Sequence, residues 1–397
     1  MTLASSANEI PSLTGLRGLA ALLVVVDHFA KWTRIGPTPQ PLLEQLAGTS
    51  GIGMAIFFTL SGYVITLSYG DWDWRDRPVF LTARLLLYRV ARLYPAFLVF
   101  AVVILLRTPA LHDLGDNQVR EYVLSRLLLV YTWFPVRLAG MVPVDDHFHV
   151  AWSLSVEAGL YVGFAIGAAV VAALPRWRLR LSVLAPLFLL STWLLLHEAW
   201  KLHPVVASDW NEGVWGHWLF LGSPYGVSMQ FALGVVACRL RRHVPAAMQS
   251  AASTAGGLAL VLAYGLVASG HAVGALDQAL LVSVATALVM MGCTSRTPTN
   301  WLLSRPAIVF VGTVSYSLYL FHFLTPHMGF SGTPDTWSLG LAASQAVNFV
   351  IASAMATALA TGMYQLVERP GRRLVRAAAD RLLGIERPLM ARGHPAE

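Results

Sequence analysis

Long apolar segments separated by short polar stretches recur along nearly all of the 397 residues. A helix needs about 20 mostly apolar residues to cross the hydrocarbon core of a bilayer. Segments of this kind predict spans at 13–31, 51–69, 91–107, 151–174, 181–200, 215–237, 252–270, 275–293, 307–327 and 338–366. The pattern therefore predicts an all-α fold, a polytopic transmembrane helical bundle of about ten spans.

The segment 122–138 is ambiguous as a further span, because it is short and holds Arg126 and Arg137. Charge asymmetry decides the question, since Lys and Arg accumulate on the cytosolic side of membrane proteins. With ten spans and a cytosolic N-terminus, about three quarters of the 28 Lys and Arg residues fall on that side. An eleventh span would move every later loop to the opposite side of the membrane, so the basic loops and the basic C-terminal segment would lie outside. We therefore predict that both termini are cytosolic and that 122–138 is an interfacial or re-entrant helix.

The composition agrees with a membrane protein, because 56% of the residues are apolar and only 12% are charged. The net charge of +7 is explained by orientation and contact with anionic lipid, so it gives no reason to expect a nucleic-acid partner. We expect an integral membrane domain over 1–376 and a basic cytosolic tail over 377–397, with no appended catalytic module. The first apolar segment is interpreted as a retained span, not a signal peptide.

The first predicted span carries polar residues in the stretch "TGLRGLAALLVVVDHFA", which covers residues 14–30. Arg17 and His28 are eleven residues apart, which places them on one face of a helix at depths that differ by about 16 Å. They therefore mark two depths along one possible polar channel. The alternatives are that Arg17 only anchors the helix at the interface and that His28 bonds a neighbouring carbonyl. The adjacent Asp27 points about 100° away from His28.

A second basic group lies in "YRVARLYPAF", at the predicted cytosolic end of the third span. Arg89 and Arg92 are three residues apart, so both fall on one helical face. Two guanidinium groups on one face suit a phosphate ligand. Ordinary anchoring at the cytosolic interface is the alternative.

Two further ionisable residues lie in the outer halves of predicted spans. Glu157 in "HVAWSLSVEAGLY" is near the predicted depth of His28, and an ionisable group there is costly unless it is paired or functional. His322 in "SYSLYLFHF" lies at a similar depth in its own span. A structural partner for a buried donor is the alternative for Glu157, and a packed, hydrogen-bonded histidine is the alternative for His322.

Other residues have structural explanations that we prefer. Cys238 and Cys293 are expected near the cytosolic face, where thiols stay reduced, and are interpreted as packing residues. Ser61 and Gly62 lack the strand-turn-helix setting of a hydrolase nucleophile and predict close helix packing. A polar outer loop explains "VDDHFHV" better than a metal site does. The remaining aromatic candidates are interpreted as interface anchors or, alternatively, as the lining of a sugar site: Trp72, Trp74, Trp152 and Trp218.

These phrases together resemble the acyltransferase 3 family of integral membrane acyltransferases. The resemblance rests on "LTGLRGLAALLVVVDHF", "IFFTLSGYVIT", "RVARLYPAF", "WSLSVEAGLY", "VSYSLYLFHF" and "ERP", which occur in the family's order. Members of the family O-acylate bacterial polysaccharides, lipopolysaccharide, Nod factors or macrolides. The resemblance therefore implies a multi-pass protein of the bacterial cytoplasmic membrane that modifies a carbohydrate, glycoconjugate or macrolide acceptor.

The resemblance also implies roles for individual residues. Arg17 and His28 match the functional arginine and histidine of the family's first helix, and Arg89 and Arg92 match its paired arginines, which are associated with the acyl-CoA donor. One departure is Ala158, where the family often has a second acidic residue after the glutamate. This departure argues against a mechanism that needs two adjacent carboxylates.

A mechanism follows from the predicted topology. Acetyl-CoA or another acyl-CoA would bind through Arg17, Arg89 and Arg92 on the cytosolic side, with its thioester near His28. His28 would act as general base or transient acyl carrier in forming an O-ester, and Glu157 would orient the imidazole or bind acceptor hydroxyls. No metal is required. The competing function is a transporter or flippase of a glycan or lipid, which also needs a polar path but performs no acyl transfer.

Overall fold

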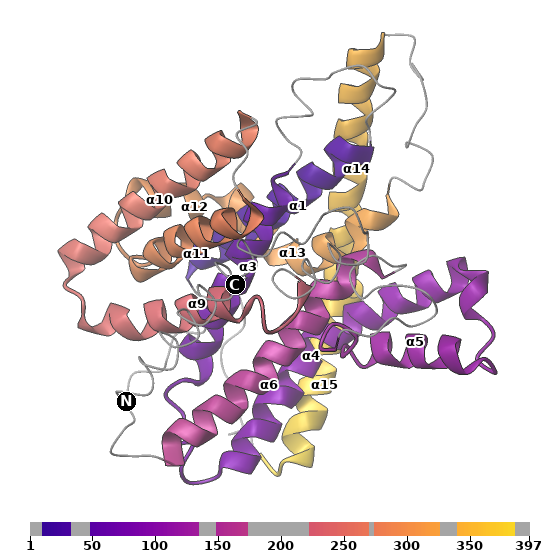
Figure 1. The fold of residues 1–397 in the computed structure, drawn as a ribbon, viewed down its shortest axis with the longest axis horizontal. Coiled ribbons are helices and arrows are strands. Elements are labelled where there is room, and N and C mark those ends of the chain that lie inside the picture. The colour runs from indigo at the N-terminus through magenta and orange to yellow at the C-terminus, as the bar shows by residue number, and fades with distance from the viewer. Residues whose placement is uncertain are drawn as a thin grey trace, which may run out of the picture.

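The computed structural model describes residues 10–32, 48–134, 148–173, 222–269, 274–325 and 340–385. All regular secondary structure in these ranges is helical (Figure 1). Seven helical segments in the described part of the chain are long and apolar enough to cross a membrane. The prediction of an all-α polytopic bundle is therefore confirmed.

The helices follow the order of the apolar segments. The longer ones are α1 (Pro11–Trp32), α3 (Ser50–Tyr69), α4 (Pro78–Arg107), α6 (Trp152–Ala173), α10 (Ala246–Ala268), α13 (Pro306–Phe321) and α14 (Leu341–Met363). The shorter α-helices are α5 (Asn117–Leu127), α9 (Ser228–Leu240), α11 (Ala275–Met291), α12 (Pro298–Leu303) and α15 (Arg369–Leu382). Single turns complete the set: η2 (Pro109–Leu111), η3 (His149–Ala151), η6 (Arg241–His243), η7 (His322–Leu324) and the π-helical η9 (Tyr364–Glu368).

One predicted span lies outside the described residues, and another is described only in part. The span 181–200 lies outside the described residues, and of 215–237 only the later part is described, where α9 ends at Leu240. The count of ten spans and the cytosolic termini therefore stay predictions.

The third span begins earlier than predicted. We expected a helix from residue 91, whereas α4 begins at Pro78 and runs for 30 residues. Proline is favoured in the first turn of a helix, because its missing N–H has no intrahelical partner there. The polar residues after Pro78 therefore belong to the helix. Arg89 and Arg92 lie 11 and 14 residues beyond its start, inside the bundle and not at its edge.

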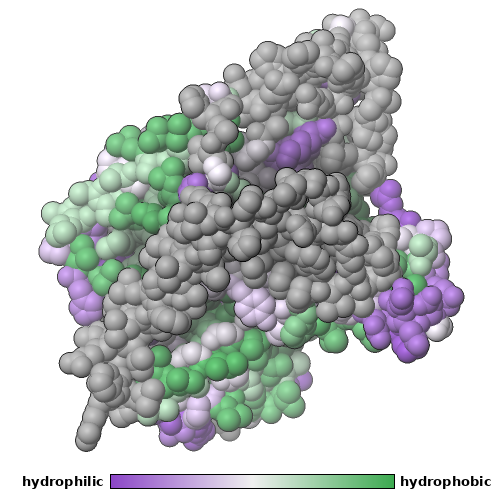
Figure 2. All heavy atoms as spheres, viewed as in Figure 1, coloured by the Kyte–Doolittle hydropathy of each residue, from purple (hydrophilic) through white to green (hydrophobic). Residues whose placement is uncertain are grey.

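The ambiguous segment begins as the short helix α5, which starts five residues before the predicted position. The Asp116 carboxylate accepts hydrogen bonds from the amides of Gln118 and Val119, which sets the start of the helix at Asn117. Its 11 residues rise about 16 Å, too little for a crossing of the bilayer core of about 30 Å. Figure 1 shows α5 projecting from the bundle, and in Figure 2 this projection is largely hydrophilic, whereas α10 presents apolar side chains. Residues 135–138 lie outside the description.

The helices α1 and α13 run parallel and touch through their backbones. A Cβ added to Gly18 would lie 2.7 Å from the amide nitrogen of Gly312, and one added to Gly312 would overlap the carbonyl oxygen of Thr14. Small residues allow such close packing of membrane helices. The same device joins α3 to α9, where Gly62 lies against the backbone of Phe231. The prediction that Gly62 serves close helix packing is therefore confirmed.

Gly312→Ala should destabilise the protein because the added methyl group forces two backbones apart. Overpacking of this kind costs about 1–3 kcal/mol. Gly163→Ala is a matched control, since nothing lies within 4 Å of a Cβ added at Gly163 in α6. Thermal unfolding in detergent should show a lower Tm for Gly312→Ala and an unchanged or higher Tm for the control. Equal Tm values for the two variants would show that the contact is not tight.

The helix α14 continues through η9 into α15, which packs beside α4 at the lower end of Figure 1. The side chain of Pro95 on α4 lies 2.5 Å from a Cβ added at Gly371, and the Tyr88 hydroxyl donates to Asp380 at 2.5 Å. The helix passes through residue 376 without a break. The division into a membrane domain and a tail at that position stays a prediction.

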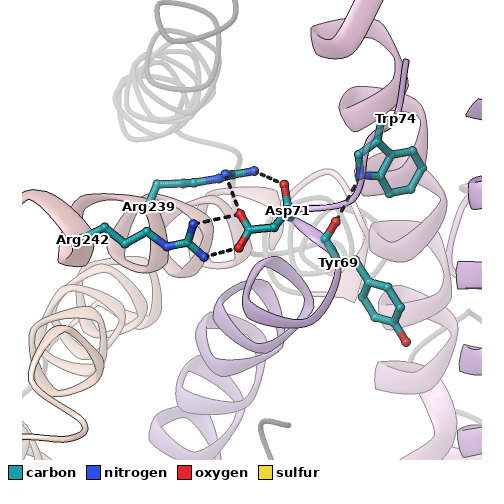
Figure 3. A network of polar contacts seen from close by, with 6 residues as sticks. Tyr69, Asp71, Trp74, Arg239 and Arg242 are labelled. Carbon is teal, nitrogen blue, oxygen red and sulfur yellow. Dashed lines mark hydrogen bonds and ion pairs between the residues drawn. The ribbon is translucent and has the colours of Figure 1, made fainter. Parts of the chain in front are cut away.

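An ion-pair cluster joins the ends of α3 and α9 (Figure 3). Arg242 binds both carboxylate oxygens of Asp71 at 2.8 and 2.6 Å, and Arg239 lies 3.7 Å from the same carboxylate. Arg239 also donates to the carbonyl oxygen of Gly70 at 2.8 Å. Hydrogen bonding to Arg242 is the main reason why the pKa of Asp71 lies below its ordinary value.

The Asp71 cluster makes stability depend on pH. A carboxyl whose pKa is lowered in the folded protein stabilises it above the unfolded pKa of about 4, and the stabilisation is lost as the pH falls through the folded value. Because Asp71 is exposed, we expect only about 0.2–1 kcal/mol. Asp71→Asn should therefore lower the Tm slightly at pH 7, and this difference should shrink as the pH falls below about 4. Asp73→Asn is the control, and an equal loss there would assign the effect to general surface charge.

Both cysteines are buried and free, as predicted. The Sγ atom of Cys293 lies 3.4 Å from the Tyr63 hydroxyl, which also accepts a hydrogen bond from Arg241 at 3.1 Å. These contacts join α3 to the segment that follows α11. The prediction that the cysteines are packing residues is confirmed.

Candidate active site

A cavity that opens to the surface lies between α1, α3, α4, α6 and α13. Arg17, Arg89 and Arg92 all line it, and so does Glu157. We call it the arginine cavity. The structure thus brings together four residues that the sequence singled out from three separate helices.

Arg89 is held by aromatic rings. Its guanidinium carbon lies 4.9 Å from the ring centre of Tyr69 and 4.9 Å from that of Tyr161. The residue is only 8% exposed, and its Nε atom has no hydrogen-bond partner among the described residues. Cation–π contact stabilises a charge without neutralising it, so Arg89 keeps N–H groups available to an anion.

Arg17 and Arg92 make no hydrogen bond and no ion pair within 4 Å to the residues that the structure describes. Their charges act on each other and, at longer range, on the carboxylates of Glu157 and Glu368. Three guanidinium groups are thus gathered around a cavity whose described lining holds one carboxylate, that of Glu157. The cavity is positively charged and suits a ligand with several negative charges.

Glu157 is bonded within the arginine cavity. Its Oε1 atom accepts hydrogen bonds from Ser61 at 2.9 Å and from Tyr161. It makes no contact with His28, which lines a different cavity. The expectation that Glu157 orients the imidazole of His28 is therefore wrong. The two residues face different cavities because the sequence sets only their depth in the membrane and not the direction in which each helix faces.

Ser61 and Glu368 also lie near the arginines, and the sequence alone predicts a functional role for neither. Ser61 lines the arginine cavity, so our interpretation of this serine as a packing residue was incomplete. Glu368 is buried at the end of η9 and accepts a hydrogen bond from Ser317 at 2.6 Å. A π-helical turn is often found at functional sites. The signal available in the sequence was the carboxyl of the closing "ERP" phrase beside an otherwise apolar span.

A second cavity lies among the end of α1 and the beginnings of α3, α9 and α11. His28 lines it, and we call it the histidine cavity. Met54, Phe58 and Tyr319 line both cavities. These three side chains form a shared wall, so the two cavities are neighbours separated by a layer of side chains.

His28 is paired with His322. The His28 Nδ1 and His322 Nε2 atoms are 2.8 Å apart, and the rings are stacked with an angle of 13° between their planes. The other nitrogen of His322, Nδ1, lies 3.1 and 2.8 Å from the carbonyl oxygens of Leu318 and Tyr319. The structure thus agrees with the alternative of a hydrogen-bonded His322, and the bonding partner is the histidine of the first span.

These contacts assign the tautomers of the two histidines. Carbonyl oxygens only accept hydrogen bonds, so Nδ1 of His322 carries its proton, and in the neutral ring Nε2 is the acceptor. His28 must then donate from Nδ1. In a neutral His28 the lone pair is then on Nε2.

The packing of α1 against α13 explains why the histidines meet. Gly18 and Gly312 are in backbone contact, and each histidine follows its glycine by ten residues. Parallel helices rise equally, by about 15 Å over ten residues, so the two imidazoles arrive at one height. This spacing was visible in the sequence, but the contact that makes it meaningful was not.

Tyr319 belongs to the shared wall and lines both cavities. Its hydroxyl oxygen accepts a hydrogen bond from Ser153 at 2.8 Å, which leaves its own proton to donate. Its backbone carbonyl is one of the two that fix His322. A single residue therefore joins the histidine pair to a hydroxyl group at the boundary between the cavities.

The tryptophans and the outer loop give mixed outcomes. Trp74 is buried and donates to the Tyr69 carbonyl at 3.1 Å, so it is not an interface anchor. Trp152 lines the histidine cavity, as the sugar-site alternative requires. Trp218 and most of the loop 144–150 lie outside the description. Among the described residues no group of three or more His, Cys, Asp or Glu side chains is placed to hold a metal ion.

Comparison with known proteins identifies the family. A profile described as an acyltransferase domain matches residues 10–365. The chain belongs to the acyltransferase 3 family. No solved structure matches the chain significantly.

Similar proteins carry related names. Acyltransferase MdmB of Streptomyces mycarofaciens is 27% identical over 98% of this chain and 96% of its own length. Nodulation protein 10 of Rhizobium leguminosarum bv. viciae is 24% identical over 93% of this chain and 95% of its own length. A Staphylococcus aureus (strain COL) protein, described as a candidate O-acetyltransferase, is 23% identical over 79% of this chain, and the match covers 50% of that protein.

Membership of the acyltransferase 3 family decides between the two functions that the sequence left open. The chain is an acyltransferase and a multi-pass membrane protein, not a transporter without chemistry. An acyltransferase requires an acyl donor and an acceptor. Both cavities described above lie within the matched residues.

Proposed function

We propose that this acyltransferase transfers an acyl group, most simply acetyl, from acyl-CoA to a hydroxyl group of a glycan or glycoconjugate. A macrolide is a further acceptor of the same chemistry. The observation that carries the proposal is the pair of adjacent cavities, one lined by three arginines and the other by His28, with Tyr319 in the wall between them.

The arginine cavity is the donor side in this proposal. CoA carries several phosphate groups, and hydrogen bonds between a guanidinium and a phosphate are strong because both partners are charged. Arg17, Arg89 and Arg92 lack close carboxylate partners among the described residues, so a phosphate would not have to displace one. The family's association of these arginines with acyl-CoA supports the same role.

The distance between the cavities suits the pantetheine arm. Arg17 and His28 are separated by a rise of about 16 Å along α1. A donor held by its phosphates among the arginines would present its thioester near the shared wall of Met54, Phe58 and Tyr319. Only the acyl group then has to reach the histidine side.

The transfer step uses Nε2 of His28 as general base. The base takes the proton of the acceptor hydroxyl while the hydroxyl oxygen attacks the thioester carbonyl carbon. The carbon–sulfur bond breaks, an ester bond forms, and the CoA sulfur leaves with the proton returned by His28. His322 acts as a positioning residue, because it fixes the tautomer of His28 through its own carbonyl contacts.

Tyr319 is placed to stabilise the negative charge on the attacked carbonyl oxygen. Its hydroxyl lies in the shared wall, and its oxygen is already bonded by Ser153. A fixed donor aimed at a developing oxyanion is among the most effective elements of a catalytic site. Glu157 serves the donor side by holding Ser61 and Tyr161, and Tyr161 packs on Arg89.

The sequence orients the two sides. With the predicted topology, the arginine cavity would face the cytosol, where acyl-CoA is made, and the histidine cavity would face the outer side of the bacterial cytoplasmic membrane. The acceptor would then be an envelope component or a product leaving the cell. The names of the similar proteins, an O-acetyltransferase among them, support ester formation.

Release of CoA by purified protein tests the proposed function. Protein in detergent or nanodiscs is incubated with acetyl-CoA and a crude envelope glycan fraction, and free thiol is measured. We expect thiol release that depends on the glycan and on protein concentration, together with new ester groups by mass spectrometry. The proposal would be contradicted if the protein consumed the thioester of no acyl-CoA.

A further inference from the structure

The described lining of the histidine cavity is uncharged apart from the ionisable His28. It contains no Asp, Glu, Lys or Arg, in contrast to the arginine cavity. Its polar side chains are His28, Ser50, Gln230, Gln278, Trp152 and Tyr319. Two cavities that share one wall therefore differ sharply in the charge of the ligand that they suit.

Two glutamines in this cavity have unsatisfied amide atoms. Gln230 on α9 is 4% exposed, and its Oε1 atom has no hydrogen-bond partner among the described residues. The same is true of Nε2 of Gln278, in the first turn of α11. A buried amide without a partner is costly, and such groups are rare unless a ligand or water completes them.

The amide pair offers both kinds of hydrogen-bonding atom. An amide oxygen accepts and an amide nitrogen donates, and a hydroxyl group does both. Turning either amide group by 180° exchanges its oxygen and its nitrogen, so the unsatisfied atom changes from an acceptor to a donor or the reverse. A hydroxyl group can bond to either kind of atom. The unsatisfied atoms therefore match a hydroxyl-bearing ligand in either orientation.

The rest of the lining is apolar and aromatic. Trp152 and Phe58 are in ring contact, and the aliphatic residues include Val24, Ala55 and Val227. Aromatic and aliphatic surface suits the ring faces of a sugar or the hydrocarbon part of an amphiphile. A carboxylate or phosphate in this cavity would lose its hydration without gaining a cation in return.

We infer that the histidine cavity is the acceptor site, that Gln230 and Gln278 bind acceptor hydroxyls, and that the acceptor is neutral where it contacts the protein. The inference rests on the proposed function and narrows it from any glycan to an uncharged, hydroxyl-bearing molecule with an apolar face. It assigns the glutamines a role in recognition and leaves the acyl-transfer chemistry with His28.

Two octyl glycosides test this assignment, because they differ at a single carbon, C6, which is neutral in one and charged in the other. Octyl β-glucoside presents a neutral sugar, and octyl β-glucuronide replaces its CH2OH group with a carboxylate. Acetyl transfer from acetyl-CoA to each is measured by mass spectrometry with protein in nanodiscs. We expect the neutral glycoside to be acetylated with a kcat/KM at least about tenfold above that of the glucuronide, the effect of one uncompensated polar interaction.

Variants locate the recognition. Gln230→Met and Gln278→Met keep the side-chain volume and remove the amide. Each should raise the KM for octyl glucoside about tenfold, the worth of about one hydrogen bond, while the KM for acetyl-CoA stays within about twofold. Gln345→Met is the matched control, since Gln345 is also buried with an unpartnered nitrogen but lines neither cavity. This control should leave both KM values unchanged.

The outcomes separate this inference from the proposed function. Consumption of acetyl-CoA without acetylation of the neutral glycoside, equal use of the glucuronide, or unchanged KM values in both glutamine variants would overturn the acceptor assignment alone. If the wild-type protein consumed no thioester at all, the proposed function would be wrong, and the acceptor assignment would be wrong with it.

Discussion

Replacing His28 with alanine is expected to lower the rate of acyl transfer by about 10²–10⁴-fold, the contribution of a positioned general base. The substitution removes the imidazole that lines the histidine cavity and is paired with His322 through Nδ1. Binding of acyl-CoA should survive, because the arginines lie in the other cavity. The measurement is kcat for ester formation, with acyl-CoA binding followed separately.

The partner histidine provides a sharper version of this experiment. His322→Leu removes the acceptor for the Nδ1 proton of His28 and should reduce kcat strongly. His322→Gln keeps an acceptor at a similar reach, because an amide oxygen can replace the ring nitrogen. Partial recovery in His322→Gln relative to His322→Leu would indicate a positioning role. Equal losses in the two variants, or normal acylation by His28→Ala, would refute the assignment of the histidine pair.

Replacing Arg89 and Arg92 together with glutamine is expected to raise the KM for acyl-CoA by about 10²–10⁴-fold. Each lost charge-assisted hydrogen bond is worth about 1.5–3 kcal/mol, or roughly 10–100-fold. Both residues line the arginine cavity, and Arg89 is buried between two rings. Steady-state kinetics with varied acyl-CoA and saturating acceptor measure the effect.

A truncated donor distinguishes phosphate binding from general damage. S-acetylpantetheine carries the thioester but no phosphate, so wild type and the double variant should use it equally. Arg84→Gln is the control on the same helix, because Arg84 lies over the ring of Trp72 and donates to Tyr88 without lining the cavity. A comparable loss with S-acetylpantetheine would mean that the arginines maintain structure and do not bind the donor.

Much of the site was predictable because it depends on position along single helices. The depths of Arg17 and His28 follow from helical rise alone, and the i, i+3 spacing of Arg89 and Arg92 puts them on one face. The apolar runs set the class of fold. Each of these features depends on one helix alone, so it does not change with the way in which neighbouring helices pack.

Features that depend on pairs of helices were not predictable in the same way. Glu157 is expected near the depth of His28, where it would orient the imidazole or bind acceptor hydroxyls, but its carboxylate bonds to Ser61 and Tyr161. The histidine pair depends on the contact of Gly18 with Gly312. The early start of α4 was missed because charged residues lower the hydropathy of a helix without ending it.

The backbone contact between α1 and α13 also bears on how fast a chemical group can pass from one cavity to the other. Helices joined glycine to backbone cannot slide past one another without breaking that contact, so the frame around His28 stays fixed during turnover. Passage from one cavity to the other then requires rotation of Met54, Phe58 and Tyr319 about their side-chain bonds. Such rotations are faster by orders of magnitude than collective helix movements, which take microseconds to milliseconds.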